Sequence, residues 1–224
     1  MLEFFKKKQV GPSKTVSEKR IKDFQEIYNS FSNDQSVDQA SRCSQCGIPY
    51  CQIHCPLNNN IPDWLKYIAE DRLEEAYEIS SSTNAFPEVC GRVCPQDRLC
   101  EGNCVVEKAG FGSITIGSLE KHITETAWEK GWIKPIVSSK KQNQKVAIIG
   151  SGPAGLAAAT YLIEYGYEVE VFEKNDRIGG LMIYGIPNFK LDKSVVIRRH
   201  EWLEESGVIF HTNCEVGKDI TFDD

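Results

Sequence analysis

The sequence predicts two domains of different class: an all-α helical domain followed by a partial α/β domain with a parallel sheet. Two observations predict the helical domain. All of the nine cysteines except Cys214 fall between Cys43 and Cys104, and apolar residues around them recur at helical spacing. One observation predicts the sheet domain, because a strand, a glycine-rich turn, a helix and a second strand follow one another after residue 145.

Composition and charge narrow the class of protein. The chain has 224 residues, of which 41% are hydrophobic and 26% are charged, as in an ordinary soluble protein of one or two domains. The first ten residues hold too short an apolar run for a secretory signal, and no run of 18 apolar residues follows. We therefore expect a cytoplasmic protein with no membrane partner. The formal net charge of −6 disfavours a nucleic-acid partner.

Apolar periodicity predicts three helices in the first part of the chain. The first is expected over 17–31, with Ser17 as its N-cap, the second over 61–80, and the third over 113–128. The expected apolar face of the first helix comprises Ile21, Phe24, Ile27, Tyr28 and Phe31. We interpret all three apolar faces as packing surfaces of a helical domain over 1–133.

The eight clustered cysteines form two runs of four, which suggests two metal sites in a reducing compartment. The spacing is C-x2-C-x4-C-x3-C-P from Cys43 to Pro56 and C-x3-C-x5-C-x3-C from Cys90 to Cys104. Structural zinc sites usually show paired C-x2-C spacings, whereas only one gap here has that length. The C-x3-C-P ending also occurs in bacterial ferredoxins, where the last cysteine ligates the other cluster. The spacing favours [4Fe–4S] clusters, with zinc and unligated structural cysteines as alternatives.

A polar stretch over 134–145 reads as a linker, and a dinucleotide-binding pattern follows it. An apolar strand over 146–149 leads into Gly150, Gly152 and Gly155, then an alanine-rich helix, then a strand that ends on Glu173. The three glycines allow a tight turn, a close approach of a pyrophosphate, and close packing of helix on strand, while the acidic residue can bind a ribose diol. The alternative is a structural glycine turn.

The last part of the sequence extends the same sheet. A helix over 193–205 and a strand over 207–212 would supply its third parallel strand. A second glycine pair, Gly179 and Gly180, follows Glu173 by a few positions. Such a pair resembles the one that flavoproteins with two dinucleotide-binding domains place against FAD.

The whole pattern resembles one family, the small (beta) subunit of bacterial NADPH-dependent glutamate synthase. The resemblance runs from about residue 20 to the end and rests on "RCSQCGIPYC", "CPLNNNIPDWL", "NAFPEVCGRVCPQDRLCEGNC", "TIGSLEKHITETAWEKGW", "VAIIGSGPAGLAAA" and "FEKNDRIGGLMIYGIPNFKL". Dihydropyrimidine dehydrogenase and the NADPH:ferredoxin oxidoreductases are similar in the same module. The expected fold is therefore a helical iron–sulfur domain followed by the first part of a Rossmann-like FAD-binding domain over 146–224.

The resemblance also implies a set of site residues. One [4Fe–4S] cluster would be held by Cys43, Cys46, Cys51 and Cys104. The second would be held by Cys55, Cys94, Cys100 and Glu120, with Cys90 unligated; the bland alternative for Glu120 is a solvated glutamate. The implied cofactor-binding residues are Gly150, Ser151, Gly152, Pro153, Ala154, Gly155, Glu173, Lys174, Gly180, Leu181 and Lys190. No residue is assigned a catalytic role.

The implied function is electron relay. FAD would accept a hydride from NADPH and pass electrons singly through the clusters to the large (alpha) subunit, where glutamine and 2-oxoglutarate become glutamate. The sequence holds no second G-x-G-x-x-G and ends where the family continues into an NADPH-binding domain, so we expect a truncated chain that cannot oxidise NADPH alone. The alternatives are a sister oxidoreductase with another partner and a metal-stabilised fragment without catalysis.

Overall fold

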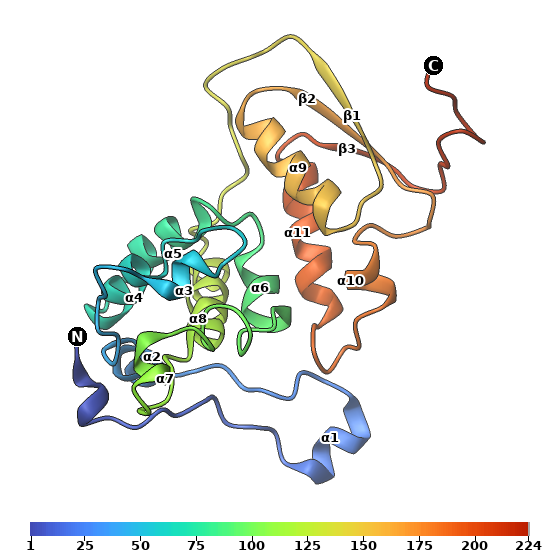
Figure 1. Cartoon of the computed structure of the whole chain (residues 1–224). Helices are drawn as coiled ribbons and strands as arrows, with labels where there is room; N and C mark the ends of the chain where they lie inside the picture. Colours follow the sequence, from blue (N-terminus) through green and yellow to red (C-terminus); the bar gives the residue numbers. More distant parts are fainter. Residues whose placement is uncertain (224) are drawn as a thin grey trace. The chain divides into compact units, whose positions relative to one another are not determined.

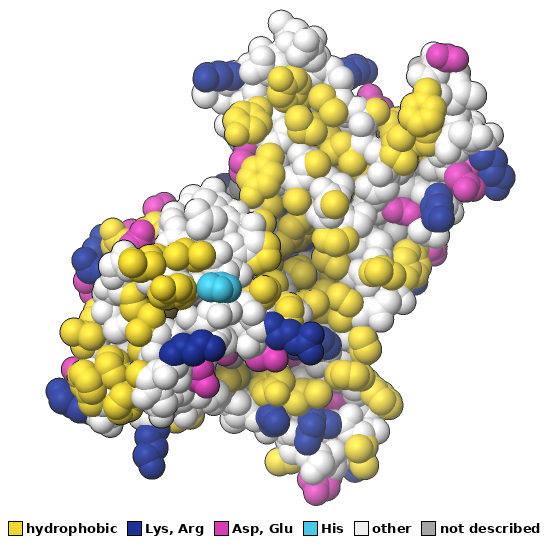
Figure 2. All heavy atoms as spheres, viewed as in Figure 1, with side chains coloured by type: hydrophobic (Ala, Val, Ile, Leu, Met, Phe, Trp, Pro, Cys, Tyr) yellow, Lys and Arg dark blue, Asp and Glu magenta, His cyan; other side chains and the backbone are white. Residues whose placement is uncertain are grey.

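The chain forms two compact units, 1–133 and from 134 onward, in a computed structural model that describes residues 1–223 (Figure 1). None of the described helices combines the length and apolar character needed to cross a membrane. On the face drawn in Figure 2, lysines and arginines lie among aspartates and glutamates rather than in one large field of a single sign.

The first unit is helical, as predicted. Its described residues form no named strand, and an isolated antiparallel bridge joins Lys14 to Tyr28. Its helices are η1 (Glu3–Phe5), α1 (Ser17–Asp23), α2 (Asn33–Ala40), α3 (Tyr50–Ile53), α4 (Ile61–Ala69), α5 (Leu73–Ser81), α6 (Pro87–Val93), α7 (Val105–Lys108) and α8 (Ile116–Glu129).

Helix α8 lies at the centre of this unit and packs against α2, α4, α5 and α6. Its apolar face buries Leu119 and Ile123 completely, and α4 buries Trp64 and Ile68 in the same core. The packing faces predicted for the second and third helices are therefore confirmed. The second prediction was wrong in one detail: Asp71 adopts a left-handed conformation (φ 58°), so the expected helix over 61–80 is two helices, α4 and α5.

The first predicted helix is wrong beyond Asp23. The Asp23 carboxylate accepts a hydrogen bond from the Gln25 N–H, Phe24 turns left-handed (φ 54°), and the chain continues without a helix. Helix α1 buries none of its residues; Ile21 and Phe24 are exposed, and Figure 1 shows α1 at the end of an extended arm. The N-cap is Val16 rather than Ser17. Apolar periodicity alone did not make a helix here because no surface packs against it.

The second unit is a three-stranded parallel sheet with helices, which confirms the predicted fold class. Strands β1 and β3 each pair with β2, in the order β1-β2-β3. Helix α9 packs against β1 and β2. Its elements are β1 (Lys145–Ile149), α9 (Pro153–Glu164), β2 (Glu168–Phe172), α10 (Leu181–Tyr184), α11 (Lys193–Glu205) and β3 (Ile209–His211).

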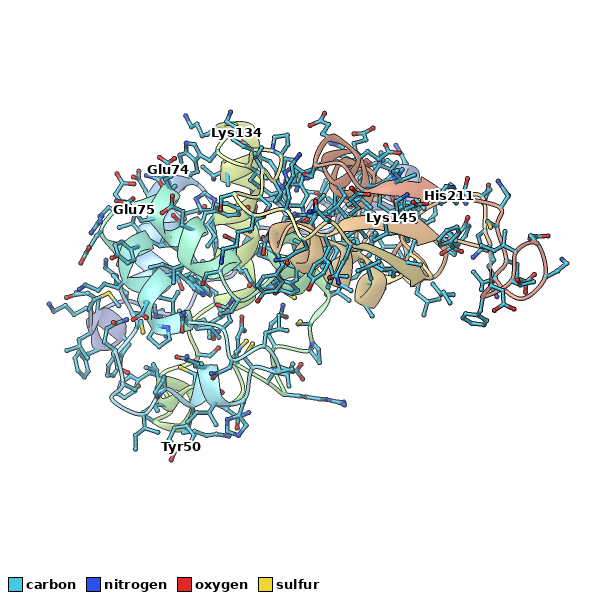
Figure 3. The ribbon with its side chains drawn as sticks, turned by 90° about the horizontal axis from the view of Figure 1, so that it is seen from above. Tyr50, Glu74, Glu75, Lys134, Lys145 and His211 are labelled. Atoms are coloured by element: carbon cyan, nitrogen blue, oxygen red, sulfur yellow. The ribbon has the colours of Figure 1, made fainter. Side chains whose placement is uncertain are left out.

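The two outer strands are both partly exposed, and each has a side chain that contacts Glu170 of the middle strand. Among the described residues β1 has no strand on its outer side, and Ile149 is 59% exposed. Glu170 of β2 contacts Lys145 of β1 at 3.4 Å and His211 of β3 at 2.9 Å, and the latter two are labelled in Figure 3. An apolar strand with an open edge is a surface that another strand can pair with.

The segment over 134–144 has no helix or strand but is held by hydrogen bonds within the second unit. The Trp202 indole N–H donates to the carbonyl of Lys134 (2.8 Å), and the Ile136 N–H donates to the Ser206 hydroxyl (2.9 Å). Farther along, the N–H of Gln142 donates to the carbonyl of Gly166 (3.0 Å).

Candidate cofactor sites

The first cysteine site combines residues that are far apart in the sequence. Cys43 follows α2, Cys51 lies in α3, and Cys104 is the N-cap of α7; together with Cys46 they line one depression. Cys104 ends the second cysteine run, so the structure interleaves the two runs instead of giving each its own site. The depression measures about 20 Å³ and is smaller than the second site described below.

Polar groups already point at the sulfurs of this first site. The Cys43 sulfur accepts hydrogen bonds from the backbone N–H and the side-chain amide of Gln45, each at 3.4 Å. The same amide donates to the carbonyl of Pro62 at 2.7 Å, which fixes its orientation. The Ser44 hydroxyl lies 2.9 Å from the Cys46 sulfur. These contacts are typical of thiolates held as metal ligands.

Burial disfavours the thiolate form of two of these cysteines. Burial raises the pKa of Cys43, and burial together with the neighbouring Cys43 and Cys104 raises the pKa of Cys51 to about 12. A bound cation favours the thiolate form, so metal binding here releases protons.

The second site is a cavity of about 230 Å³ inside the helical unit. Its wall includes Cys55 from the turn after α3 and Cys90 from α6. Cys94 and Cys100 come from the turns that follow α6, and Glu120 comes from α8. Protein interiors contain few voids of this size, and a void costs stability. A cavity lined by four thiols and a carboxyl therefore fits a bulky inorganic group.

Among the described residues, no group of three or more His, Cys, Asp or Glu side chains is placed to hold one metal ion. A [4Fe–4S] cluster separates its ligands because each binds a different iron atom. Cysteines spread over the wall of a site are compatible with such a cluster. His54, which lies between Cys51 and Cys55 in the sequence, is exposed and bonded through Nδ1 to the Tyr50 carbonyl (2.9 Å), away from both sites.

Glu120 is buried in the cavity wall, which excludes the alternative of a solvated glutamate; its role as a ligand stays a prediction. Its Oε1 accepts a hydrogen bond from the Asn84 amide at 2.9 Å. The Asn84 carbonyl in turn accepts from the Phe86 N–H (2.9 Å), which fixes the amide. Burial raises the pKa of Glu120 to about 8. A buried carboxyl of this kind gains a partner when a cation binds.

Cys90 and Asn84 were not assigned a role from the sequence. The Cys90 thiol donates a hydrogen bond to the side-chain carbonyl oxygen of Asn84 at 3.6 Å. Cys90 lies one helical turn before Cys94, and the interaction between the two thiols lowers the pKa of Cys94. Asn84 is the first residue of the segment "NAFPEVCGRVCPQDRLCEGNC", but nothing in that segment indicated its contact with Glu120, and Cys90 was visible as a member of the second cysteine run.

The glycine-rich turn has the geometry that a dinucleotide site requires. Gly150 has a φ of 92°, which favours glycine. A Cβ on Gly155 would lie 2.0 Å from the Gly150 carbonyl oxygen, so only glycine allows this helix-to-strand contact. A Cβ on Gly152 would meet nothing within 4 Å, which leaves room for a ligand at the first turn of α9. A Cβ on Gly180 would lie 2.8 Å from the Cα of Gly152, so the second glycine pair abuts this turn.

Glu173 organises the loops around that turn. Its Oε2 accepts hydrogen bonds from the Ser151 N–H (3.0 Å) and hydroxyl (2.6 Å), and its Oε1 accepts from the Asn175 N–H (2.9 Å) and side-chain amide (2.6 Å). Burial opposes ionisation, but these donors outweigh it and hold the pKa of Glu173 low. Four donors fill the acceptor positions of the carboxylate. A ribose diol must therefore replace a side-chain donor.

The remaining predicted cofactor residues lie around the same turn. Ser151 is buried, whereas Pro153 and Ala154 at the start of α9 are exposed. Lys174 in the loop after β2 is also exposed, as are Leu181 at the start of α10 and Lys190 in the loop after α10. Their contacts with a cofactor stay a prediction.

Comparison with known proteins gives matches in both units. Residues 20–132 match the family model described as dihydropyrimidine dehydrogenase domain II, 4Fe-4S cluster, and residues 148–195 match an NAD(P)-binding Rossmann-like domain. The glutamate synthase [NADPH] small chain of Azospirillum brasilense is 58% identical over 221 residues, which are 99% of this chain and 46% of that protein.

Two Escherichia coli K12 proteins are similar as well. The glutamate synthase [NADPH] small chain of this bacterium is 48% identical over 99% of this chain and 47% of that protein. The putative oxidoreductase AegA of the same bacterium is 46% identical over 95% of this chain and 32% of that protein. The chain thus spans about half the length, or less, of these curated relatives. With its interleaved cysteines and glycine-rich turn, the chain belongs to the 4Fe-4S family of dihydropyrimidine dehydrogenase domain II and is a homologue of glutamate synthase [NADPH] small chains.

Proposed function

We propose that the chain is the electron-relay part of a glutamate synthase small chain. It holds two [4Fe–4S] clusters and FAD, and it delivers electrons from NADPH to the large (alpha) subunit, which forms glutamate from glutamine and 2-oxoglutarate. The observation that carries the proposal is the meeting of both cysteine runs at two sites in one helical unit, in a chain 58% identical to such a small chain. The iron–sulfur part is assigned to 1–133, the linker to 134–145 and the flavin part to 146–224.

The proposed ligands of each cluster are residues that line the same depression or cavity. One cluster is held by Cys43, Cys46, Cys51 and Cys104, and the other by Cys55, Cys94, Cys100 and Glu120, with Cys90 beside it. When bound, clusters and flavin convert the two-electron chemistry of a nicotinamide into single-electron transfer. The protein contributes burial, orientation of the ligands and exclusion of water. Asn84 orients Glu120, and Gln45 orients the sulfur of Cys43.

The flavin site is proposed at the glycine-rich turn. The free N–H groups at the start of α9, a helix of 12 residues, face a pyrophosphate with the positive end of the helix dipole. Glu173 binds the ribose after the Ser151 hydroxyl or the Asn175 amide releases it. FAD content of the purified chain, measured by fluorescence after denaturation, tests this part.

We also propose that these 224 residues do not oxidise NADPH by themselves, because one glycine-rich dinucleotide turn is present and β1 has an open edge. The purified chain should fail to reduce an artificial dye with NADPH but should bind a glutamate synthase large subunit in gel filtration. NADPH-driven dye reduction at the rate of a complete small chain would contradict the first statement. Failure to bind the large subunit would contradict the second.

A sister oxidoreductase is the second candidate. Identity to AegA is 46%, close to the 48% identity to the small chain from the same bacterium, so identity over this module does not choose the electron acceptor. Isolation of the native complex separates the two candidates. A glutamate synthase large subunit in the complex supports the first, and a different acceptor supports the second.

A further inference from the structure

The two proposed cluster sites differ in the charges and dipoles that surround them. Four thiolates at one site and three thiolates plus a carboxylate at the other give the same formal ligand charge. The ligand type contributes to each reduction potential, and so do the surroundings, through hydrogen bonds to the ligands, nearby charges and burial. Donors and cations stabilise the reduced, more negative state and raise the potential. Carboxylates and apolar walls lower it.

The first site, of Cys43, Cys46, Cys51 and Cys104, has donors on two of its sulfurs. Gln45 directs two N–H groups at the Cys43 sulfur. The Ser44 hydroxyl lies 2.9 Å from the Cys46 sulfur, and it must be the donor once that sulfur is a thiolate, because a thiolate can only accept.

A buried cation adds to these donors. Arg42 is fully buried next to Cys43 in the sequence, and it makes hydrogen bonds to the backbone carbonyls of Lys7, Phe111, Gly112 and Ser113. Its guanidinium is close enough to Cys104 for the two to interact electrostatically. Backbone carbonyls accept its hydrogen bonds without cancelling its charge, and although Glu107 also interacts with it electrostatically, the guanidinium remains the cation near the first site.

The second site, of Cys55, Cys94, Cys100 and Glu120, has the opposite surroundings. No basic side chain is among the described residues that line the cavity. Glu88 lies near Glu120 and Glu101 lies near Cys100. The rest of the wall is mainly apolar, with Leu57, Ile61, Trp64, Leu99 and Ile116. The side-chain amide of Asn84 donates to the Glu120 carboxylate at 2.9 Å, and the Ser80 hydroxyl is a second donor near that carboxylate.

We infer that the first site holds the cluster of higher reduction potential, so that an electron entering at the second site moves to the first. This inference rests on the proposed function, and it adds a direction to the relay. The transfer is of one electron, from a reduced cluster at the second site to an oxidised cluster at the first, and no bond forms or breaks.

The test is a potentiometric titration of the full chain, followed by electron paramagnetic resonance, after iron and sulfide analysis has shown that both clusters are present. Ser44→Ala removes the hydroxyl donor at the first site, and Ser44→Thr keeps it as a matched control. Asn84→Ala removes the amide donor at the second site. We expect two reduction waves. Ser44→Ala should lower only the upper wave, Ser44→Thr should leave both unchanged, and Asn84→Ala should lower or abolish only the lower wave.

The inference is overturned if Ser44→Ala lowers the lower wave, if Asn84→Ala lowers the upper wave, if neither variant moves a wave, or if the two waves coincide in the unmodified chain. A chain without iron and sulfide is a separate result, because it refutes the proposed function before any potential is measured. Thermal unfolding of each variant shows whether a shifted wave comes from lost structure.

Discussion

Glu26 anchors the N-terminal arm to the two helices that carry part of the second site, and its replacement by glutamine gives a sharp test of that packing. Its Oε1 lies 2.6 Å from Arg92 Nε on α6, and its Oε2 lies 2.6 Å from Lys121 Nζ on α8. The three side chains are 18%, 6% and 12% exposed. Arg92 also contacts Glu125 at 2.9 Å, so the pair belongs to a network.

The expected cost follows from this burial. Removing one partner of a fully buried ion pair costs about 3–5 kcal/mol, and partial exposure with the remaining Arg92–Glu125 contact reduces this to about 2–3 kcal/mol. That is roughly a 30- to 160-fold change in the unfolding equilibrium. Urea unfolding of the parent and Glu26→Gln chains at pH 7, followed by far-ultraviolet circular dichroism, measures the difference. Glu75→Gln is the control, because Glu75 pairs with Arg72 on the exposed surface and its loss should not change stability measurably.

The difference in the free energy of unfolding between the parent and Glu26→Gln chains should depend on pH, and the sign of this dependence follows from the pKa of Glu26. Burial alone would raise the pKa of Glu26, but the charge of Arg92 and hydrogen bonds from Lys121 and Arg92 hold it below its usual value of 4.5. A carboxyl whose pKa is lower in the folded state stabilises the fold above the unfolded pKa, and this contribution is lost as the pH falls through the folded pKa. The parent should therefore lose its advantage over Glu26→Gln below about pH 4.5. An equal difference at pH 7 and at pH 4, or no difference at pH 7, refutes the reasoning.

Three further changes test the cofactor sites. Cys94→Ser should remove the second cluster and about half of the iron, with a loss of thermal stability because metal binding contributes to folding; iron content equal to that of the parent contradicts the ligand assignment. Gly155→Ala places a Cβ 2.0 Å from the Gly150 carbonyl oxygen and should destabilise the sheet unit in urea, whereas Gly152→Ala meets nothing within 4 Å and should leave its stability unchanged. Glu173→Gln cannot accept all four hydrogen bonds that the carboxylate accepts, so the chain should retain less FAD; unchanged FAD content and stability would show that Glu173 does not organise this turn.

The sequence predicted the second unit well because local and tertiary preferences agree there. The helix over 193–205 was predicted with its observed bounds, and the three strands form the expected parallel sheet. The spacing of the glycines also predicted local geometry: the tight turn at Gly150 and the close helix-to-strand contact at Gly155 are both observed. Local signals succeed when the packing surface they imply is present.

The helical unit shows where such signals fail. The apolar spacing over 17–31 predicted one long helix. The helix ends at Asp23 instead, and the Asp23 turn, the Lys14–Tyr28 bridge and the ion pairs of Glu26 hold the following residues in a non-helical conformation. The bridge and the Glu26 ion pairs join residues distant in the sequence, and the Asp23 turn is a local side-chain contact; apolar periodicity carries no information about either kind.

The grouping of the cysteines was another limit of local information. Spacing alone gave two runs of four, whereas Cys104 lies with Cys43, Cys46 and Cys51 because the start of α7 returns to the first run. The resemblance to a known family implied this exchange, and ferredoxin-like spacing had indicated a crossover only for Cys55. Asn84, which positions Glu120, begins one of the family-like segments, but the segment gave no indication of this contact.

The most direct test of the central claim is the visible absorption of the chain purified without oxygen, recorded before and after dithionite together with iron and acid-labile sulfide. If two [4Fe–4S] clusters are bound, the protein is brown and contains about eight iron atoms per chain, and its broad absorption bleaches on reduction. Yellow flavin bands are added if FAD stays bound. A colourless protein, or one that contains zinc and no sulfide, contradicts the account, because no electron relay could then pass through these cysteines.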